Sequence, residues 1–390
     1  MSLWSTVSPV PLAWHQLAEQ RVRFAVAVLG VTFAVVLVLM QLGFRNALYA
    51  SAVRLHEHLA GDVVLISPKY SYLGVSAPFS HRRLQQVRSH PAVSGVAPIW
   101  FDVAPWKNPD TGMARNLLVI AVDPVDAPLH LEGLAERLGR TRVSDTLLFD
   151  SASRSEFGVS PAVLRSGRRL TTELGARRVF VDGSYVLGTS FAVDGSAITG
   201  PSTFLRLFPN RREGLIDIGL VRLRPGADAD AVRAELAAEL PKDVDVLTRA
   251  GFIAREQTYW AANTPIGYVF AFGMVMGLVV GGVIVYLVLF VNVAEHLPQF
   301  ATLKAIGFTD GALFGVVAQQ ALILAAAGFT VGVLLCHGLY AVSADATQLP
   351  MELTVETGAL LFTLTLLMCC TSGAAALLKV RAADPAEVFA

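Results

Sequence analysis

Four stretches of the chain carry no aspartate, glutamate, lysine or arginine and are long enough to cross a lipid bilayer. They predict transmembrane helices at residues 24–42, 263–291, 311–342 and 357–378. A span needs about 20 apolar residues, because a helix rises about 1.5 Å per residue and the hydrocarbon core is about 30 Å thick. A signal-peptide interpretation of the first stretch is disfavoured, since its apolar run is longer than a typical h-region. The pattern predicts an α-helical membrane protein with four transmembrane helices.

Basic residues next to the predicted spans indicate the orientation of the chain. Arg21 and Arg23 precede the first span, Lys304 follows the second, and Lys379 and Arg381 follow the fourth. The positive-inside rule places these positions in the cytoplasm. The predicted cytoplasmic parts are therefore the N-terminal segment 1–23, the loop 292–310 and the tail 379–390, whereas residues 43–262 and the short loop 343–356 lie outside.

Composition and charge agree with a membrane protein. Charged residues make up 16% of the chain, against roughly 25% in an average soluble protein, and the mean hydropathy is +0.54. The formal net charge is zero and no basic run occurs, which argues against nucleic-acid binding. Cys336, Cys369 and Cys370 all fall inside predicted spans, so no disulfide is expected in residues 43–262.

The outer segment 43–262 has the pattern of an α+β domain inserted between the first and second spans. A stretch with helical spacing occupies residues 229–240. Residues 178–187 predict a hairpin that turns at Asp182 and Gly183, and residues 104–113 and 195–210 predict loops, since they are rich in Pro, Gly, Asn and Ser. Short apolar runs bounded by turn residues predict strands at residues 62–67, 116–123, 146–150, 216–223 and 243–248.

The sequence contains few candidates for catalysis. It has no P-loop, no nucleophile elbow and no H-E-x-x-H motif. His56 and His58 are two residues apart on a predicted helix and point away from one another, which favours a solvated helix face over a metal site. Asp145, Asp150 and Glu156 are interpreted as turn formers and not as an acid/base pair. We therefore expect no catalytic residue, metal site or cofactor in this chain.

Glycines recur at every fourth residue of the second span. Gly273, Gly277 and Gly281 share one face of that helix, where another helix can approach closely. Tight helix packing, with a dimer axis as one location for it, is favoured over local flexibility.

Other polar and aromatic residues of the spans also suggest their surroundings. Tyr259, Trp260 and Tyr268 are predicted to form an aromatic belt at the outer end of the second span. Gln319, Gln320 and His337 lie within the third span and are expected to face other helices, because polar groups in lipid need partners.

The polar loop 292–310 is the strongest candidate for a functional site. Residues 298–306 are predicted to form a short helix that ends at Gly307 in a left-handed cap. A helix parallel to the membrane would suit docking into a groove of a soluble partner, and the alternative is an ordinary polar connector. The candidate residues are Glu295, His296, Gln299, Phe300, Thr302, Leu303, Lys304, Ile306 and Gly307.

The same loop carries a resemblance to a known family. Residues 295–307, with the sequence EHLPQFATLKAIG, resemble the pattern of an acidic residue followed by L-K/R-A-I-G in MacB/FtsX-like ABC permeases. The chain is more closely similar to the DevC-type exporter permease, and this likeness extends over nearly its whole length. It appears at residues 11–14, 40–44, 62–68, 106–109, 149–154 and 384–388.

The resemblance implies a four-span permease that works as a homodimer in the cell inner membrane, with its large domain in the periplasm. It implies a separate ABC ATPase that binds ATP and Mg, because no ATPase domain is fused to this chain. It also implies a membrane-fusion adaptor and an outer-membrane channel as partners, in addition to the lipid of the membrane itself.

The function that follows is mechanotransmission by a permease subunit that is not itself an enzyme. The second span would continue outward as a stalk from about Phe252 and carry the ATPase-driven motion to the outer domain. The output would be export of a glycolipid or another amphiphile. Two alternatives stay open, namely FtsX-like regulation of a cell-wall hydrolase and LolC/LolE-like lipoprotein extraction.

Overall fold

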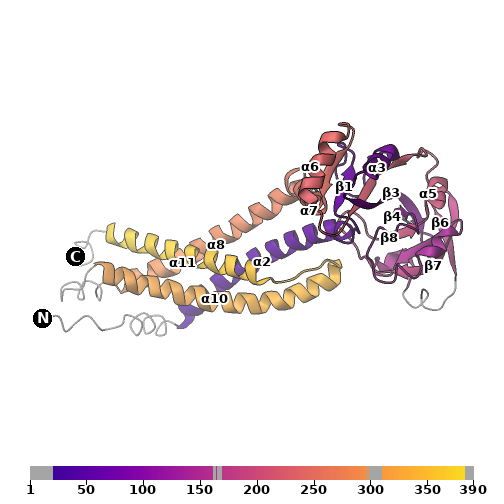
Figure 1. Cartoon of the computed structure of the whole chain (residues 1–390). Coiled ribbons are helices and arrows are strands. Elements are labelled where there is room, and N and C mark those ends of the chain that lie inside the picture. Colours follow the sequence, from indigo (N-terminus) through magenta and orange to yellow (C-terminus); the bar gives the residue numbers. More distant parts are fainter. Residues whose placement is uncertain (1–20, 161–163, 165–168, 297, 299–309, 383–390) are drawn as a thin grey trace. The chain divides into compact units, whose positions relative to one another are not determined.

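A computed structural model describes residues 21–160, 164, 169–296, 298 and 310–382 of the chain (Figure 1). The chain divides into two compact units. The helical unit consists of the residues up to Ala47, residues 266–347 and the residues from Met351 onward. The α+β domain consists of residues 48–265 together with residues 348–350.

Within the described residues, four helices are long and apolar enough to cross a membrane. They are α2 (Arg21–Glu57), α8 (Pro265–Glu295), α10 (Asp310–Thr347) and α11 (Val355–Ala382). The large α+β domain lies between the first and second of them in the sequence, which confirms the predicted fold class.

Helix α2 packs against two of the other helices of the helical unit. Its buried residues Val31, Val35 and Val38 share one apolar core with Leu289 of α8 and Leu324 of α10. Figure 1 shows α10 and α11 running side by side. The core of this unit is therefore built around α2.

The α+β domain is organised by a nine-stranded mixed sheet with the order β11-β1-β10-β3-β4-β8-β5-β7-β6. Most pairs are antiparallel, and β4–β8 and β5–β7 are parallel. A separate two-stranded sheet pairs β2 (Phe79–Ser80) with β9 (Leu215–Ile216). The strands of the large sheet are β1 (Val63–Ile66), β3 (Val93–Lys107), β4 (Ala114–Val122), β5 (Thr146–Asp150), β6 (Leu170–Leu174), β7 (Arg177–Tyr185), β8 (Ser196–Thr199), β10 (Ile218–Leu223) and β11 (Asp245–Thr248).

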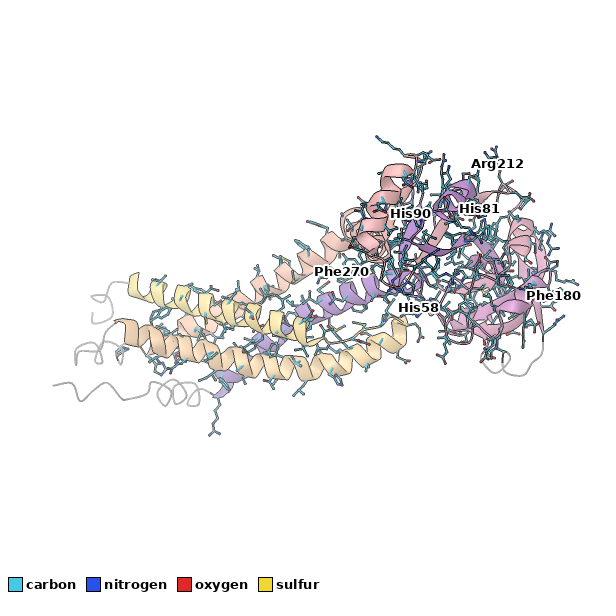
Figure 2. The ribbon with its side chains drawn as sticks, in the orientation of Figure 1. His58, His81, His90, Phe180, Arg212 and Phe270 are labelled. Carbon is cyan, nitrogen blue, oxygen red and sulfur yellow. The ribbon has the colours of Figure 1, made fainter. Side chains whose placement is uncertain are left out.

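Short helices cover the sheet. They are α3 (His81–Val87), α5 (Pro201–Leu207), α6 (Ala229–Glu239) and α7 (Arg249–Ala262), with 3₁₀ turns at Leu138–Arg142 and Ser155–Phe157. His90, which follows α3 and is labelled in Figure 2, forms an ion pair of 3.1 Å with Glu235 of α6. This contact joins two helices that share one apolar core.

Strand β1 shows how the two faces of the sheet are covered. All four of its residues are buried, because successive side chains of a strand point to opposite faces and both faces are packed. Val63 and Leu65 belong to a core with residues of α3 and α6. Val64 and Ile66 belong to the main core of the domain, which includes Phe252 of α7. Helix α7 is thus part of the domain's own core.

The predicted hairpin at Asp182 and Gly183 is wrong. Strand β7 runs through both residues, and the register of its pairing with β5 shifts between Leu147 and Phe149 at this point. The Asp-Gly pair therefore forms an irregularity within a strand. The hairpin turn instead joins β6 to β7 at Gly175, whose φ of +59° is a left-handed conformation that glycine adopts readily.

The two predicted loops are also partly wrong. Strand β3 extends to Lys107, and residues 195–210 contain strand β8 and helix α5. Pro201 was interpreted as a loop residue, but it stands in the first turn of α5, where the missing amide N–H breaks no helical hydrogen bond. The strand–helix–strand unit formed by β10, α6 and β11 agrees with its prediction.

Candidate functional site

The C-terminal end of α8 leads into the predicted coupling loop. Glu295, the last residue of the helix, forms an ion pair with Arg23 near the start of α2. His296 is buried, and its Nδ1 donates a hydrogen bond of 2.8 Å to the carbonyl oxygen of Asn292. The end of α8 is therefore paired with α2, and the side chain of His296, the next residue, caps a carbonyl group of the last helical turn. The other candidate residues of the loop lie outside the described residues, namely Gln299, Phe300, Thr302, Leu303, Lys304, Ile306 and Gly307.

The three glycines of α8 all face helix α2 of the same chain. A Cβ atom added at Gly273 would lie 2.5 Å from Gln41 Nε2 and one at Gly281 would lie 2.4 Å from Ala34 Cβ. At Gly277 the nearest atom would be Leu37 Cδ2, at 2.7 Å. At Gly281 the neighbouring atom is a Cβ that cannot rotate away, so this position requires glycine for the observed spacing of the two helices. At Gly273 and Gly277 the nearest atoms are the ends of flexible side chains, which would have to shift to admit a larger residue.

Two glycines of α10, Gly328 and Gly332, allow that helix to approach α2 closely. Cβ atoms at Gly328 and Gly332 would lie 2.5 Å from side-chain atoms of Val31 and Val35. Sequence reasoning missed this pair, although the spacing of four residues within the third span was visible. Glycines thus bring both α8 and α10 close to α2.

Two polar residues of α10 lie in different surroundings. Gln320 is fully buried in the helical unit, as expected. His337 is exposed on the surface of α10 and is not covered by another described helix of this chain, so its predicted helix partner stays a prediction.

A buried carboxylate joins three segments of the α+β domain. Glu256 of α7 is fully buried and accepts hydrogen bonds from the Tyr70 hydroxyl (2.9 Å), the Leu73 backbone N–H (3.1 Å) and Trp260 Nε1 (3.1 Å). Nε2 of His56, on the last turn of α2, lies 3.6 Å from Glu256. We call these five residues the Glu256 hub. It connects the end of α2, helix α7 and the segment that follows β1.

The electrostatics of the hub favour one protonation state of the tyrosine. Burial raises the pKa of Tyr70 well above its usual value, and the neighbouring carboxylate of Glu256 raises it further. The hydroxyl therefore stays protonated and donates a hydrogen bond to the carboxylate. The hub carries no arrangement of nucleophile, base and oxyanion donors, so its contacts indicate a structural connection.

The prediction of a solvated helix face at His56 is wrong. The ring is almost fully buried, packs against Phe252 with ring centroids 4.4 Å apart, and contacts the Tyr70 hydroxyl. His58 does not take part in this cluster, and its Nδ1 donates a hydrogen bond of 2.7 Å to the carbonyl oxygen of Arg54. Across the described residues, no group of three or more His, Cys, Asp or Glu side chains could hold a metal ion. The missed signal was Glu256, which is distant in sequence and opposite His56 in space.

The predicted aromatic belt is divided between two environments. Trp260 is largely buried within the α+β domain, and both Trp260 and Tyr259 pack on Tyr72 with centroids about 5 Å apart. Tyr268, in the first turns of α8, is 71% exposed. Only Tyr268 is placed as an interfacial residue would be, because the other two rings are used for packing inside the domain.

Asp150 organises a turn, which agrees with its interpretation as a turn former. Its carboxylate accepts hydrogen bonds from the backbone N–H groups of Ala152 (3.0 Å), Leu187 (3.0 Å) and Gly188 (2.8 Å). Burial raises its pKa, and these hydrogen bonds oppose part of that rise. Asp145 also lies in a turn, with a left-handed φ of +59° directly before β5, and it pairs with Arg206. Glu156 lies in the 3₁₀ turn Ser155–Phe157 and pairs with Arg115.

Two models of known protein families match this chain, one over residues 24–239 and the other over residues 271–385. Residues 24–239 match the family model of the MacB-like periplasmic core domain, which is more than half of the 390-residue chain. Residues 271–385 match the model of the FtsX-like permease C-terminal region.

Known relatives match almost the entire chain. Two uncharacterised ABC transporter permeases of Mycobacterium tuberculosis (strain ATCC 25618 / H37Rv) are each 26% identical over 381 residues. The match covers 96% of this chain and 97% of each relative.

Among solved structures, the periplasmic region of MacB from Actinobacillus actinomycetemcomitans gives a TM-score of 0.37 at 10% identity, covering 51% of this chain and 93% of that one. The extracellular domain of the ABC-type transporter YknZ from Gram-positive bacteria gives 0.33 at 10% identity, covering 48% and 98%.

Proposed function

Because this chain belongs to the ABC transporter permease family with a MacB-like periplasmic core domain and an FtsX-like C-terminal region, we propose that it transmits force from a separate ATPase. The chain has no P-loop, so ATP and Mg would be bound by the partner subunit. Its own role would be that of a non-catalytic membrane subunit. Such a subunit couples two sites only if its parts change contacts between two states.

The proposed orientation places the α+β domain in the periplasm and the loop 292–310 in the cytoplasm. Basic residues support this orientation, because Arg21, Arg23, Lys304, Lys379 and Arg381 all lie at the ends assigned to the cytoplasm. The ATPase would then contact the loop, where Glu295 and Lys304 supply charges of opposite sign. Membership of the family supports this arrangement in the cell inner membrane.

The observation that carries the proposal is the continuity between the coupling loop and the α+β domain. Helix α8 ends at Glu295 beside the loop, and its other end is separated from α7 by only Asn263 and Thr264. Helix α7 is held in the domain core by Phe252 and Glu256. A displacement of α8 along its axis would therefore reach the domain through two residues of chain and helix α7, whose Phe252, Glu256 and Trp260 are buried.

The output that we propose is export, through a membrane-fusion adaptor and an outer-membrane channel, with the permease acting as a homodimer. This finer assignment rests on the sequence likeness to DevC-type exporter permeases. The corresponding cargo would be a glycolipid or another amphiphile. The exposed apolar faces of the four long helices, which suit contact with lipid, are compatible with such a cargo.

Capture of partners from intact membranes tests the proposal. A photo-crosslinking residue placed at Thr302 should trap a nucleotide-hydrolysing subunit, whereas the same residue at Asp230, an exposed position of α6, should not. Co-purification of an adaptor favours export, and co-purification of a cell-wall hydrolase favours FtsX-like regulation. Labelling of residue 302 from the periplasmic side, or purification without any ATPase, would overturn the proposed coupling.

A further inference from the structure

A half-open groove on the surface of the α+β domain is lined by both aromatic and charged side chains. Its volume is about 510 Å³, which falls within the range of small-molecule sites, roughly 300–1,000 Å³. Its lining includes the rings of Tyr72 and Phe191, called here the aromatic wall, and the charged side chains of Arg115 and Asp194, called here the polar wall. We call it the Tyr72–Arg115 groove. All of its residues belong to the same compact unit.

Both rings of the aromatic wall pack on one buried tryptophan, Trp260. The centroid of the Trp260 ring lies 5.1 Å from that of Tyr72 and 5.4 Å from that of Phe191. Phe191 is nevertheless 48% exposed, which is unusual for a phenylalanine packed on one side. Rings held in place before a ligand arrives lose little conformational entropy on binding, and aromatic faces attract cations.

The polar wall contains both signs of charge in equal number. Nη1 of Arg115 donates to Oδ2 of Asp194 at 2.7 Å, and Nε of Arg154 lies 2.8 Å from Oδ1 of the same carboxylate. Oε1 of Glu156 lies 3.9 Å from Nη2 of Arg115. Arg115 and Asp194, which line the groove, cancel formally. Arg154 and Glu156, which pair with them from outside the lining, also cancel, so the lining offers no surplus charge to a simple anion or a simple cation.

We propose that the Tyr72–Arg115 groove binds the head group of a zwitterionic amphiphile. The anionic group of the ligand accepts hydrogen bonds from Arg115, which has five donors and uses only part of them on Asp194. The cationic group lies against the rings of Tyr72 and Phe191. A net-neutral ligand with separated charges matches a wall of zero net charge, whereas a simple anion faces Asp194 and a simple cation faces Arg115.

The groove is connected to the helix that leads to the membrane span. The ring of Tyr72 stacks on Tyr259 of α7 with centroids 5.0 Å apart, and the backbone N–H of Leu73 donates to Glu256 of the same helix. A displacement of α7 therefore moves the aromatic wall. This inference rests on the proposed function, because it names a ligand class for the α+β domain, to which the motion of the permease's own α8 would be transmitted.

Binding to the intact, purified permease tests the inference without ATPase or nucleotide. The chain is placed in nanodiscs of phosphatidylglycerol, so that no zwitterionic lipid competes, and titrated calorimetrically with dihexanoyl-phosphatidylcholine below its micelle concentration. We expect saturable binding that Tyr72→Ala and Arg115→Gln each weaken by roughly tenfold or more. Tyr72→Phe, which keeps the ring, should bind within about twofold of wild type. Tyr268→Ala is the matched control, since that tyrosine is exposed on α8 and outside the groove.

Further ligands separate the contributions of charge and chain. Glycerophosphocholine carries the same zwitterion without acyl chains, so its binding measures the contribution of the head group. Tighter binding of the lipid than of glycerophosphocholine supports an amphiphile, and equal binding of the two points to a soluble ligand and contradicts that part of the inference. Asp194→Asn leaves the two arginines in excess and should shift the preference toward dihexanoyl-phosphatidylglycerol. Thermal unfolding of each variant confirms that the domain is folded.

Three results would overturn the inference. They are equal or tighter binding of dihexanoyl-phosphatidylglycerol or hexyl glucoside to wild type, absence of binding by both phosphocholine ligands, and unchanged binding after both Tyr72→Ala and Arg115→Gln. A failure here leaves the proposed ATPase coupling intact, because no ATPase takes part. Conversely, failure to capture an ATPase leaves the binding result unaffected.

Discussion

Glu256 is a carboxylate placed where only its hydrogen bonds make burial tolerable. A buried ionised group is costly unless donors surround it, and the Glu256 hub supplies a hydroxyl, a backbone amide and an indole N–H. These donors come from two segments, α7 and the segment after β1, which also pack on one another through Tyr70 and Phe252. The side chain therefore contributes to the position of the segment around Tyr70 as well as to stability.

Replacing Glu256 should destabilise the α+β domain strongly. Glu256→Ala leaves the Leu73 N–H and the Trp260 Nε1–H buried without an acceptor, so we expect a loss of about 3 kcal/mol or more. The midpoint of thermal unfolding of the full chain should fall by roughly 6–12 °C. Glu235→Ala removes a carboxylate that is 60% exposed in its ion pair with His90 and should change stability by less than about 0.5 kcal/mol. Equal effects of the two substitutions would contradict this account of the hub.

Asp150 should make stability depend on pH in the acidic range. Its folded-state pKa is raised above the ordinary 3.8, chiefly by burial. The folded protein therefore binds this proton more tightly than the unfolded chain, and the free energy of unfolding falls as pH rises from about 4 through the raised pKa. Asp150→Asn cannot ionise and should show a smaller decline in melting temperature over the same interval. Parallel curves for wild type and variant would show that Asp150 does not contribute.

At the scale of elements, helix α2 is the common partner of α8 and α10. Glycines provide the contact on both sides, because lipid offers no hydrophobic driving force and close backbone approach maximises van der Waals contact. Ser372 of α11 adds a hydrogen bond of 2.9 Å to the carbonyl oxygen of Gly282. The helical unit is thus held by shape and a few polar contacts.

A larger residue at the α2–α8 contact should separate the two helices. Gly281→Leu places side-chain atoms where Ala34 and Met368 already lie, and overpacking of this kind costs about 1–3 kcal/mol. We expect a lower midpoint of thermal aggregation in detergent. Gly338→Leu in α10 is the matched control, since no atom lies within 4 Å of the added Cβ. A neutral Gly281→Leu variant would mean that α8 does not need its observed distance from α2.

The hairpin prediction failed at the same scale because local and tertiary preferences disagree. Asp182-Gly183 has the composition of a tight turn, yet it lies in β7 beside β5. Arg140 and Arg169 both pair with the carboxylate of Asp182. The turn is instead formed at Gly175, which adopts a left-handed conformation and whose backbone N–H donates to the carbonyl oxygen of Pro105 in β3.

At the scale of the whole molecule, the ion pair between Arg23 and Glu295 separates two explanations of coupling. Glu295 could act by holding α8 to α2 or by contacting the proposed ATPase, and a charge swap distinguishes them. The readout is ATP turnover of the complex reconstituted in nanodiscs.

We expect Glu295→Arg to reduce permease-dependent ATP turnover by about 5–150-fold, the usual range of a coupling free energy, while the chain still inserts into the membrane. Combining it with Arg23→Glu restores the ion pair within the chain and should not restore turnover. Recovery in the double variant would show that Glu295 acts through Arg23 alone.

The membrane class, the four spans and the position of the α+β domain between the first two could be predicted from the sequence. Each of these depends on the free energy of placing a residue type in lipid, which is a property of the residue and its neighbours in the chain. The glycine spacing in α8 was visible for the same reason, since residues four apart share a helix face.

The partners of those residues became evident only in the folded chain. Glu256 meets Tyr70 and His56 across about 190 residues of sequence, and no local pattern marks a buried carboxylate as different from an exposed one. The Tyr72–Arg115 groove likewise combines residues from separate loops and strands. Such sites depend on long-range packing, because burial and charge pairing are properties of the assembled domain.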